Sequence, residues 1–129
     1  MLPASYNDLL QIFQTEDYVV IFQEMSNNDP RIVPLDGRQH LPSTIRQWSG
    51  DSRGHWEGET LVVDTVDFAD HWSPYGSGTG NPSGAEKHVV ERYRLSDDGT
   101  HAFVDIVLED PEYLAEPVTA KSRCVLLSR

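Results

Sequence analysis

One stretch of sequence, residues 53–68, constrains the fold of this chain more than any other. It reads RGHWEGETLVVDTVDF and consists of two runs of alternating side chains that meet at residues 57–59. Gly58 can take the positive φ that a short bulged turn requires. The pattern therefore predicts two antiparallel strands joined by a tight turn.

The alternation also places acidic side chains where a core needs apolar ones, because side chains two apart in a strand share a face. One predicted face carries Arg53, His55 and Glu57, and another carries Val62, Asp64, Val66 and Phe68. In a later run, residues 88–95, Glu91 shares a face with Val89, Tyr93 and Leu95. We predict that Asp64 or Glu91, or both, point into the interior within hydrogen-bonding reach of an arginine.

The rest of the chain is a succession of short strand patterns separated by turn residues. Predicted strands cover residues 9–14, 18–25, 31–35, 88–95, 101–109 and 117–127, with hairpin turns at 15–17 and 97–99. Residues 45–48 suit either a short strand or a single helical turn. No apolar stripe with the helical period extends for about ten residues.

These patterns predict a single all-β domain, residues 1–129, built as an antiparallel meander of about eight strands. Closing the meander into a small, lipocalin-like barrel would remove its exposed edges and leave room for one small ligand. A two-sheet sandwich is the alternative. The connection 69–84, rich in Gly, Ser and Pro, is either a lid over a site or a mobile loop.

Composition excludes several classes of function. With a formal net charge of −11, the chain lacks the basic surface of a nucleic-acid-binding protein, and binding to an anionic membrane surface is disfavoured. No apolar run approaches a membrane span, so membrane insertion is not expected. Cys124 is the single cysteine, which rules out an intrachain disulfide and a thiolate cluster for zinc.

The two acids on apolar faces have two interpretations. They can be structural ions paired with Arg38, Arg46, Arg53 or Arg92. They can also act as general acid and general base, because different settings shift carboxyl pKa values in different directions. On the second interpretation the candidate catalytic residues are Asp64, Glu91, His55 and Arg53.

Aromatic and basic side chains supply candidates for the walls of a ligand pocket. The predicted ligand-binding residues are Arg38, His40, Trp48, Trp56, Trp72, Tyr75 and Tyr93. If the barrel has an open end, the connection 69–84 should border it. That arrangement would bring together His40, His55, Glu57, His71, Trp72 and Tyr75.

A metal site is a weaker possibility. His55 and Glu57 are two apart on one face, and His40, His71 or His88 could complete a ligand set. The chain has no His-x-His strand pair and no His-Glu-x-x-His helix. The sequence therefore predicts no cofactor, and a metal-dependent enzyme stays a second alternative.

Two functional classes follow from these residues. The first is a small cofactor-free lyase, isomerase or hydrolase that works by acid/base chemistry on a small organic molecule. The second is a barrel that binds such a molecule without changing it. In either class the partner is a small organic ligand, and the apolar sheet faces also allow a homodimer. The richness in polar side chains favours the enzyme.

Two motifs resemble an abundant group of small uncharacterised bacterial proteins, many of which carry secretion signals. They are DGRQHLP at residues 36–42 and GDSRGHWEGETLVVDT at residues 50–65. The resemblance continues through HVVERY at 88–93 and EDP at 109–111. It implies a common fold and a periplasmic or secreted location, with the cytoplasm as the alternative, and it implies no particular chemistry.

Overall fold

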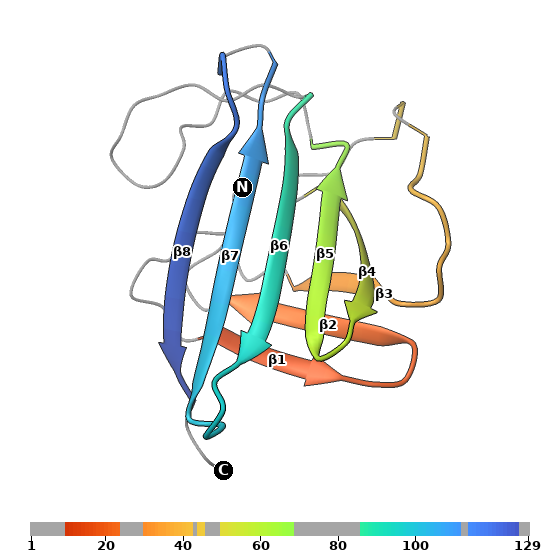
Figure 1. The fold of residues 1–129 in the computed structure, drawn as a ribbon. Helices are drawn as coiled ribbons and strands as arrows, with labels where there is room; N and C mark the ends of the chain where they lie inside the picture. The colour runs from red at the N-terminus through yellow and green to blue at the C-terminus, as the bar shows by residue number, and fades with distance from the viewer. Residues whose placement is uncertain are drawn as a thin grey trace.

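The protein was analysed as a computed structural model, which describes residues 10–23, 30–42, 44–45, 50–68, 86–111 and 114–126. These residues form eight strands (Figure 1). The strands are β1 (Leu10–Gln14), β2 (Tyr18–Gln23), β3 (Arg31–Pro34), β4 (Asp51–Glu57), β5 (Thr60–Val66), β6 (His88–Leu95), β7 (His101–Glu109) and β8 (Val118–Val125).

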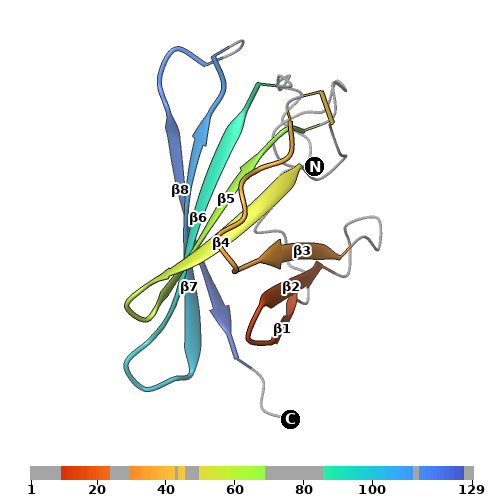
Figure 2. The ribbon, with the colours of Figure 1, turned by 90° about the vertical axis from the view of Figure 1, so that its right-hand side faces the viewer.

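The eight strands form two antiparallel sheets, and strands that are neighbours in sequence pair within each sheet. The first sheet has the order β1-β2-β3 and the second the order β4-β5-β6-β7-β8. The small sheet lies against one face of the large one, and its strands cross those of the large sheet steeply (Figures 1 and 2). The prediction of an all-β chain with about eight antiparallel strands is confirmed, but the meander is divided between two sheets.

The predicted closed barrel is wrong, and the two-sheet alternative describes the fold. Among the described strands, β3 and β4 follow each other in the chain but belong to different sheets, and β1 does not pair with β8. The chain therefore folds one open sheet over the other. The apolar faces of both sheets are buried between them, so closure into one barrel is not needed to cover them.

The three predicted hairpin turns are confirmed. Residues 15–17, Gly58 with Glu59, and 96–100 connect consecutive strands, as the three predicted hairpins require. Gly58 and Gly99 have φ values of 64° and 72°. In the segment predicted as a strand or helical turn, Thr44 and Ile45 form a turn and a bend, and residues 46–48 lie outside the described part of the chain.

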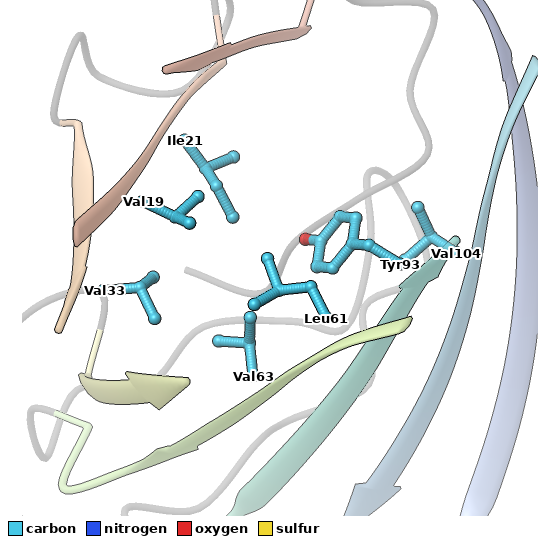
Figure 3. Close-up of a cluster of buried hydrophobic side chains, with 7 residues drawn as sticks. All are labelled: Val19, Ile21, Val33, Leu61, Val63, Tyr93 and Val104. Carbon is cyan, nitrogen blue, oxygen red and sulfur yellow. The ribbon is translucent and has the colours of Figure 1, made fainter. Parts of the chain in front are cut away.

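The core lies between the two sheets. Small-sheet side chains pack onto the middle of the large sheet (Figure 3), in a cluster formed by Val19, Ile21, Val33, Leu61, Val63, Tyr93 and Val104. A second cluster of Phe68, Val89 and Leu108 continues along the same face of the large sheet. We call this face the inner face and the opposite one the outer face.

Gly54 allows β3 to lie close to β4. A Cβ atom at this position would lie 2.8 Å from Val33 Cγ1 and 2.8 Å from Leu35 Cδ2. A side chain here would push the small sheet away from the large one. The glycine within β4 is therefore a packing requirement.

A buried ion pair joins the two sheets. Arg31, the first residue of β3, donates from Nη2 to Glu91 Oε1 at 2.6 Å and from Nη1 to Glu91 Oε2 at 3.2 Å. Glu91 lies on β6 with a side chain that is 0% exposed. This bidentate geometry is the strongest that arginine and a carboxylate can form.

Three further side chains complete this buried polar cluster. The Tyr93 hydroxyl donates to Glu91 Oε2 at 2.5 Å. Arg31 Nη2 also approaches Ser52 Oγ at 3.4 Å and Thr65 Oγ1 at 3.3 Å, and those two hydroxyl oxygens are 2.8 Å apart. The buried polar cluster, Arg31, Ser52, Thr65, Glu91 and Tyr93, thus connects β3 to β4, β5 and β6. No buried side-chain nitrogen or oxygen of the described residues lacks a hydrogen-bond partner.

The charges in this cluster depend on one another. Burial is the largest influence on the pKa of the Arg31 guanidinium and would lower it, but the charges and hydrogen bonds of Glu91 and Tyr93 together outweigh burial, and the pKa is raised. Burial, together with the neighbouring Glu91 carboxylate, raises the pKa of the Tyr93 hydroxyl well above its ordinary value. Arg31 therefore stays charged and Tyr93 stays a hydrogen-bond donor.

We expect Glu91→Leu to lower the free energy of unfolding by about 3 to 5 kcal/mol, because it leaves the Arg31 charge buried without a partner. The double variant Arg31→Met/Glu91→Leu should lose clearly less than the sum of the two single variants, because it removes both charges. Urea unfolding of the four proteins measures the coupling. Arg38→Met is the matched control, since its partner Asp36 is exposed; additive effects at residues 31 and 91 would contradict the pairing.

Tyr93 should make the protein sensitive to alkali. Its pKa is raised on folding, so its contribution to stability is present below the unfolded value of 10.0 and is lost as pH rises above it. Unfolding free energies measured from about pH 9 to pH 12 should therefore fall more steeply for the wild type than for Tyr93→Phe. Equal slopes for the two proteins would show that this hydroxyl titrates alike in both states.

Candidate active site

Asp64 and Glu91 lie on opposite faces of the large sheet. Glu91 is opposite Val63 of β5, whereas Asp64 is opposite Val90 of β6. Because paired residues share a face and the faces alternate along a strand, the two acids point in opposite directions. The prediction of an interior acid near an arginine is met by Glu91 alone, and its partner is Arg31, which was not among the arginines proposed for it.

The outer face carries residues that the sequence pattern assigns to two different faces. Arg53 of β4 pairs with Asp64, and His55 pairs with Val62. The face with Arg53 and His55 is therefore also the face of Asp64. Val62 is only 3% exposed there, which explains why its strand had the pattern of a core strand.

A group of histidines and carboxylates gathers at one end of the outer face. His40 Nδ1 lies 3.0 Å from Asp51 Oδ2, and His40 Nε2 lies 3.2 Å from Asp64 Oδ1. His88 Nε2 lies 2.9 Å from the same Asp64 oxygen. His88 Nδ1 is 3.8 Å from Glu109 Oε2. We call these residues, His40, Asp51, Asp64, His88 and Glu109, the outer-face cluster.

Strand ends and one connection position the cluster. Asp51 is the first residue of β4, His88 the first of β6 and Glu109 the last of β7, and His88 is directly opposite Glu109. Neighbouring strands are antiparallel, so these strand termini meet at one end of the sheet. Asp64 lies near the same end on β5, and His40 approaches it from the connection between β3 and β4.

Asp51 anchors that connection. Its Oδ2 accepts from the backbone N–H of Leu41 at 2.9 Å as well as facing His40, and its Oδ1 accepts from Arg53 Nη1 at 2.7 Å. Arg53 Nε in turn donates to the carbonyl oxygen of Gln39 at 3.1 Å. The Asp51 side chain is 6% exposed. Asp51 and Arg53 thus fix the position of His40 and have a supporting role.

The other members are accessible to solvent. The exposed fraction is 29% for the His40 side chain, 35% for His88 and 38% for Asp64. A small molecule can therefore reach both imidazoles and the carboxylate between them. Glu91 has no such access, because its side chain is fully buried.

The hydrogen-bond inventory of the cluster suits proton transfer. Both ring nitrogens of His40 face carboxylate oxygens, and an ionised carboxylate only accepts. His40 therefore makes both bonds only when its ring carries two protons. Asp64 Oδ1 also faces the Nε2 of His88. A proton can be held on either ring or on the carboxylate, which is the requirement for general acid and base chemistry.

The remaining predicted site residues lie elsewhere or outside the described residues. Arg38 binds Asp36 and the Tyr18 hydroxyl at 3.1 Å, and Tyr93 belongs to the buried polar cluster. His55 is exposed and lies 3.3 Å from Glu57. Trp56 is 47% exposed and pairs with Leu61 on the inner face. Trp48, His71, Trp72 and Tyr75, together with the connection 69–84, fall in segments that the structure does not describe.

Sequence reasoning missed three important residues. Arg31 could have been found by alternation, because it shares a face with Val33, which is 0% exposed. Asp51 and Glu109 stand at strand ends, where alternation gives no face until the register is known. His88 was considered only as a metal ligand, and its contact with Asp64 depends on the pairing of β5 with β6.

The described residues include no group of three or more His, Cys, Asp or Glu side chains arranged to hold a metal ion. They also include no helix long and apolar enough to cross a membrane.

Comparison with known proteins gives no relative: no family model matches this chain, and no match was found among curated proteins or solved structures. The resemblance carried by residues 36–42 and 50–65 therefore stays a prediction.

The supporting and exposed acids should differ in their effect on stability. We expect Asp51→Ala to lower the free energy of unfolding by about 3 kcal/mol, because it leaves the Arg53 guanidinium and a backbone N–H without their acceptor. Asp64→Ala should lower it by less than about 1 kcal/mol, because Asp64 is more than a third exposed and water replaces its partners. Urea unfolding of both variants tests this, and equal losses would show that Asp64 is also a structural ion.

Proposed function

We propose that the outer-face cluster is the active site of a small cofactor-free enzyme that performs acid/base chemistry on a small organic molecule. The observation that carries the proposal is that one oxygen of Asp64 is shared by the Nε2 atoms of His40 and His88. All three side chains are partly exposed, so the group that would move a proton is open to a substrate.

Each residue has a distinct role in this proposal. Asp64 orients both rings and compensates positive charge that develops on either of them. His88 exchanges a proton with the substrate, because its Nδ1 has only a distant second carboxylate, Glu109. His40 is held more firmly, through Asp51, and returns the proton through Asp64. Lyases, isomerases and hydrolases all use such a pair of proton carriers.

The earlier candidates Glu91 and Tyr93 are not part of this proposal. Their hydrogen bonds are satisfied within the core, and their burial separates them from any substrate on the outer face. Arg53 supports the site by holding Asp51. His55 lies outside the cluster, where its ring approaches Glu57, and it makes a suitable control residue.

A general proton-abstraction probe, 5-nitrobenzisoxazole, tests the proposal. A base removes its ring C–H proton, the N–O bond breaks, and a coloured phenolate forms. We expect the wild-type protein to accelerate this reaction above buffer, and His88→Gln and Asp64→Asn each to reduce the protein-dependent rate by at least about tenfold. His55→Gln, which changes an exposed histidine outside the cluster, should leave the rate unchanged.

Two results would contradict the proposed enzymatic activity. A rate equal to that of buffer would remove the support for proton transfer. Equal rates in the wild type and in the His88 and Asp64 variants would place the reactivity elsewhere. If NMR shifts of His40 and His88 show that the probe binds without turnover, the alternative of a non-catalytic binding protein is the better description.

A further inference from the structure

A patch of positive charge lies on the outer face of the large sheet. Alternate residues of β6 from His88 onward share this face, and the strand register continues it across β7 to β8. Because His88 begins β6 and Glu109 ends β7, the patch lies toward the end of these strands that is remote from the outer-face cluster. We call the following five residues the basic patch: Arg92 and Arg94 of β6, Phe103 of β7, and Lys121 and Arg123 of β8.

Phe103 stands at the centre of the basic patch. It is directly opposite Arg94 on one side and Arg123 on the other. The Arg94 guanidinium lies over the ring, with its Cζ 4.4 Å from the ring centroid. This stacking restricts the guanidinium and leaves its N–H groups able to bind an anion. All four cations are exposed, and the small sheet lies against the other face of the large sheet (Figure 2).

The positive charge of the patch is not neutralised by neighbours. Within the part of the chain that the structure describes, Arg94, Lys121 and Arg123 form no ion pair, and Arg92 has only a long contact with Glu57, from Nε to Oε2 at 4.0 Å. The chain has 21 acidic residues and 10 lysines and arginines, so this does not come from a shortage of acids. The net charge gives no sign of the patch, because it is a sum over the whole chain.

A neighbouring acid and protection of the sheet edge explain only part of this arrangement. Asp105 is opposite Arg92 and Lys121 and offsets charge in that row, but the row through Phe103 contains no acid from β6 to β8. Cations on the edge strand β8 also oppose pairing with a further strand. β6 is an interior strand, so edge protection gives no reason for Arg92 and Arg94.

The spacing of the cations matches an extended peptide. Residues two apart in a strand lie about 6.8 Å from each other on one face, and the patch has two such pairs, Arg92 with Arg94 and Lys121 with Arg123. An extended peptide with acidic side chains at alternate positions repeats at the same distance. Guanidinium groups bind carboxylates through two parallel hydrogen bonds.

Longer polyanions fit the patch less well. Nucleic acid and an anionic membrane carry charge well beyond the width of three strands, where they would meet the remainder of a chain with a formal net charge of −11. A short acidic peptide contacts the patch alone. Its apolar atoms can also cover the Phe103 ring, which is partly exposed.

We propose that the basic patch binds an extended segment of a partner protein that carries Asp or Glu at alternate positions. Arg94 and Arg123 hold one carboxylate from either side of Phe103, and Arg92 and Lys121 contact the next carboxylate along the strands. This binding is separate from the proposed proton transfer, because no residue of the patch belongs to the outer-face cluster. The cations are exposed, so each contact is weak and the affinity depends on several of them together.

NMR titration with two synthetic peptides tests the proposal. One has the order Glu-Ser-Glu-Ser-Glu-Ser, and the other has the same composition with its three glutamates adjacent. We expect the first to shift amide signals of β6, β7 and β8 and to bind at least about threefold more tightly than the second, because only alternate side chains share a face. Arg94→Gln and Arg123→Gln should each raise its dissociation constant by about threefold to fivefold, and the double variant by about tenfold or more.

Arg38→Gln is the matched control, because it removes the same charge from an exposed arginine outside the patch and should leave the dissociation constant unchanged. No shifts with the alternating peptide, equal affinities for the two peptides, or equal affinities of the wild type and the double variant would overturn the proposal. Vesicles that contain anionic lipid and a single-stranded DNA oligonucleotide are the competing probes. Tighter binding of either one than of the alternating peptide would assign the patch to a membrane or a nucleic acid and overturn the acidic peptide.

Discussion

The pairing of Arg31 with Glu91 is the interaction on which the arrangement of the two sheets depends. A carboxylate that is 0% exposed persists only with a close opposite charge and a full set of hydrogen bonds. Arg31 supplies the charge from the small sheet, and the Tyr93 hydroxyl donates a further hydrogen bond to the carboxylate. Ser52 and Thr65 of the large sheet accept from Arg31. Because all these atoms must meet, β3 has one position over β4, β5 and β6, and Gly54 leaves space for it.

The burial of Glu91 also determines where chemistry is possible. The pleat of the sheet places Glu91 and Asp64 on opposite faces, so one acid is buried in the core and the other is partly exposed to solvent. The cluster around Asp64 lies at strand ends, where solvent reaches its side chains. Solvent lowers the free-energy cost of holding several charges close together. Asp51, buried beneath His40, is the link between this exposed group and the rigid sheet.

Local features of the fold were predictable, and its closure was not. β6 and β7 have the bounds predicted from alternation and the turn at 97–99, because both depend on neighbouring residues. Whether β3 pairs with β4 depends on contacts that are distant in sequence, such as Arg31 with Glu91.

The candidate site could be predicted only in part, for the same reason. Val62 gives β5 a core-like pattern although it lies on the outer face beside His55 and Arg92, which have long side chains that can cover an apolar neighbour. The approach of His40 to Asp64 depends on a connection without periodicity.

The charge of the protein limits which molecules reach the outer-face cluster. Three of its five members are acids, and they belong to a chain with a formal net charge of −11. Among the described residues, Arg53 lies directly opposite Asp64, and it is already engaged by Asp51. An anionic substrate would therefore meet a repulsive field on approach. For the proposed enzyme we therefore expect neutral or cationic substrates, because an imidazole that removes a proton from a neutral substrate gains stabilisation from the carboxylates on either side of it.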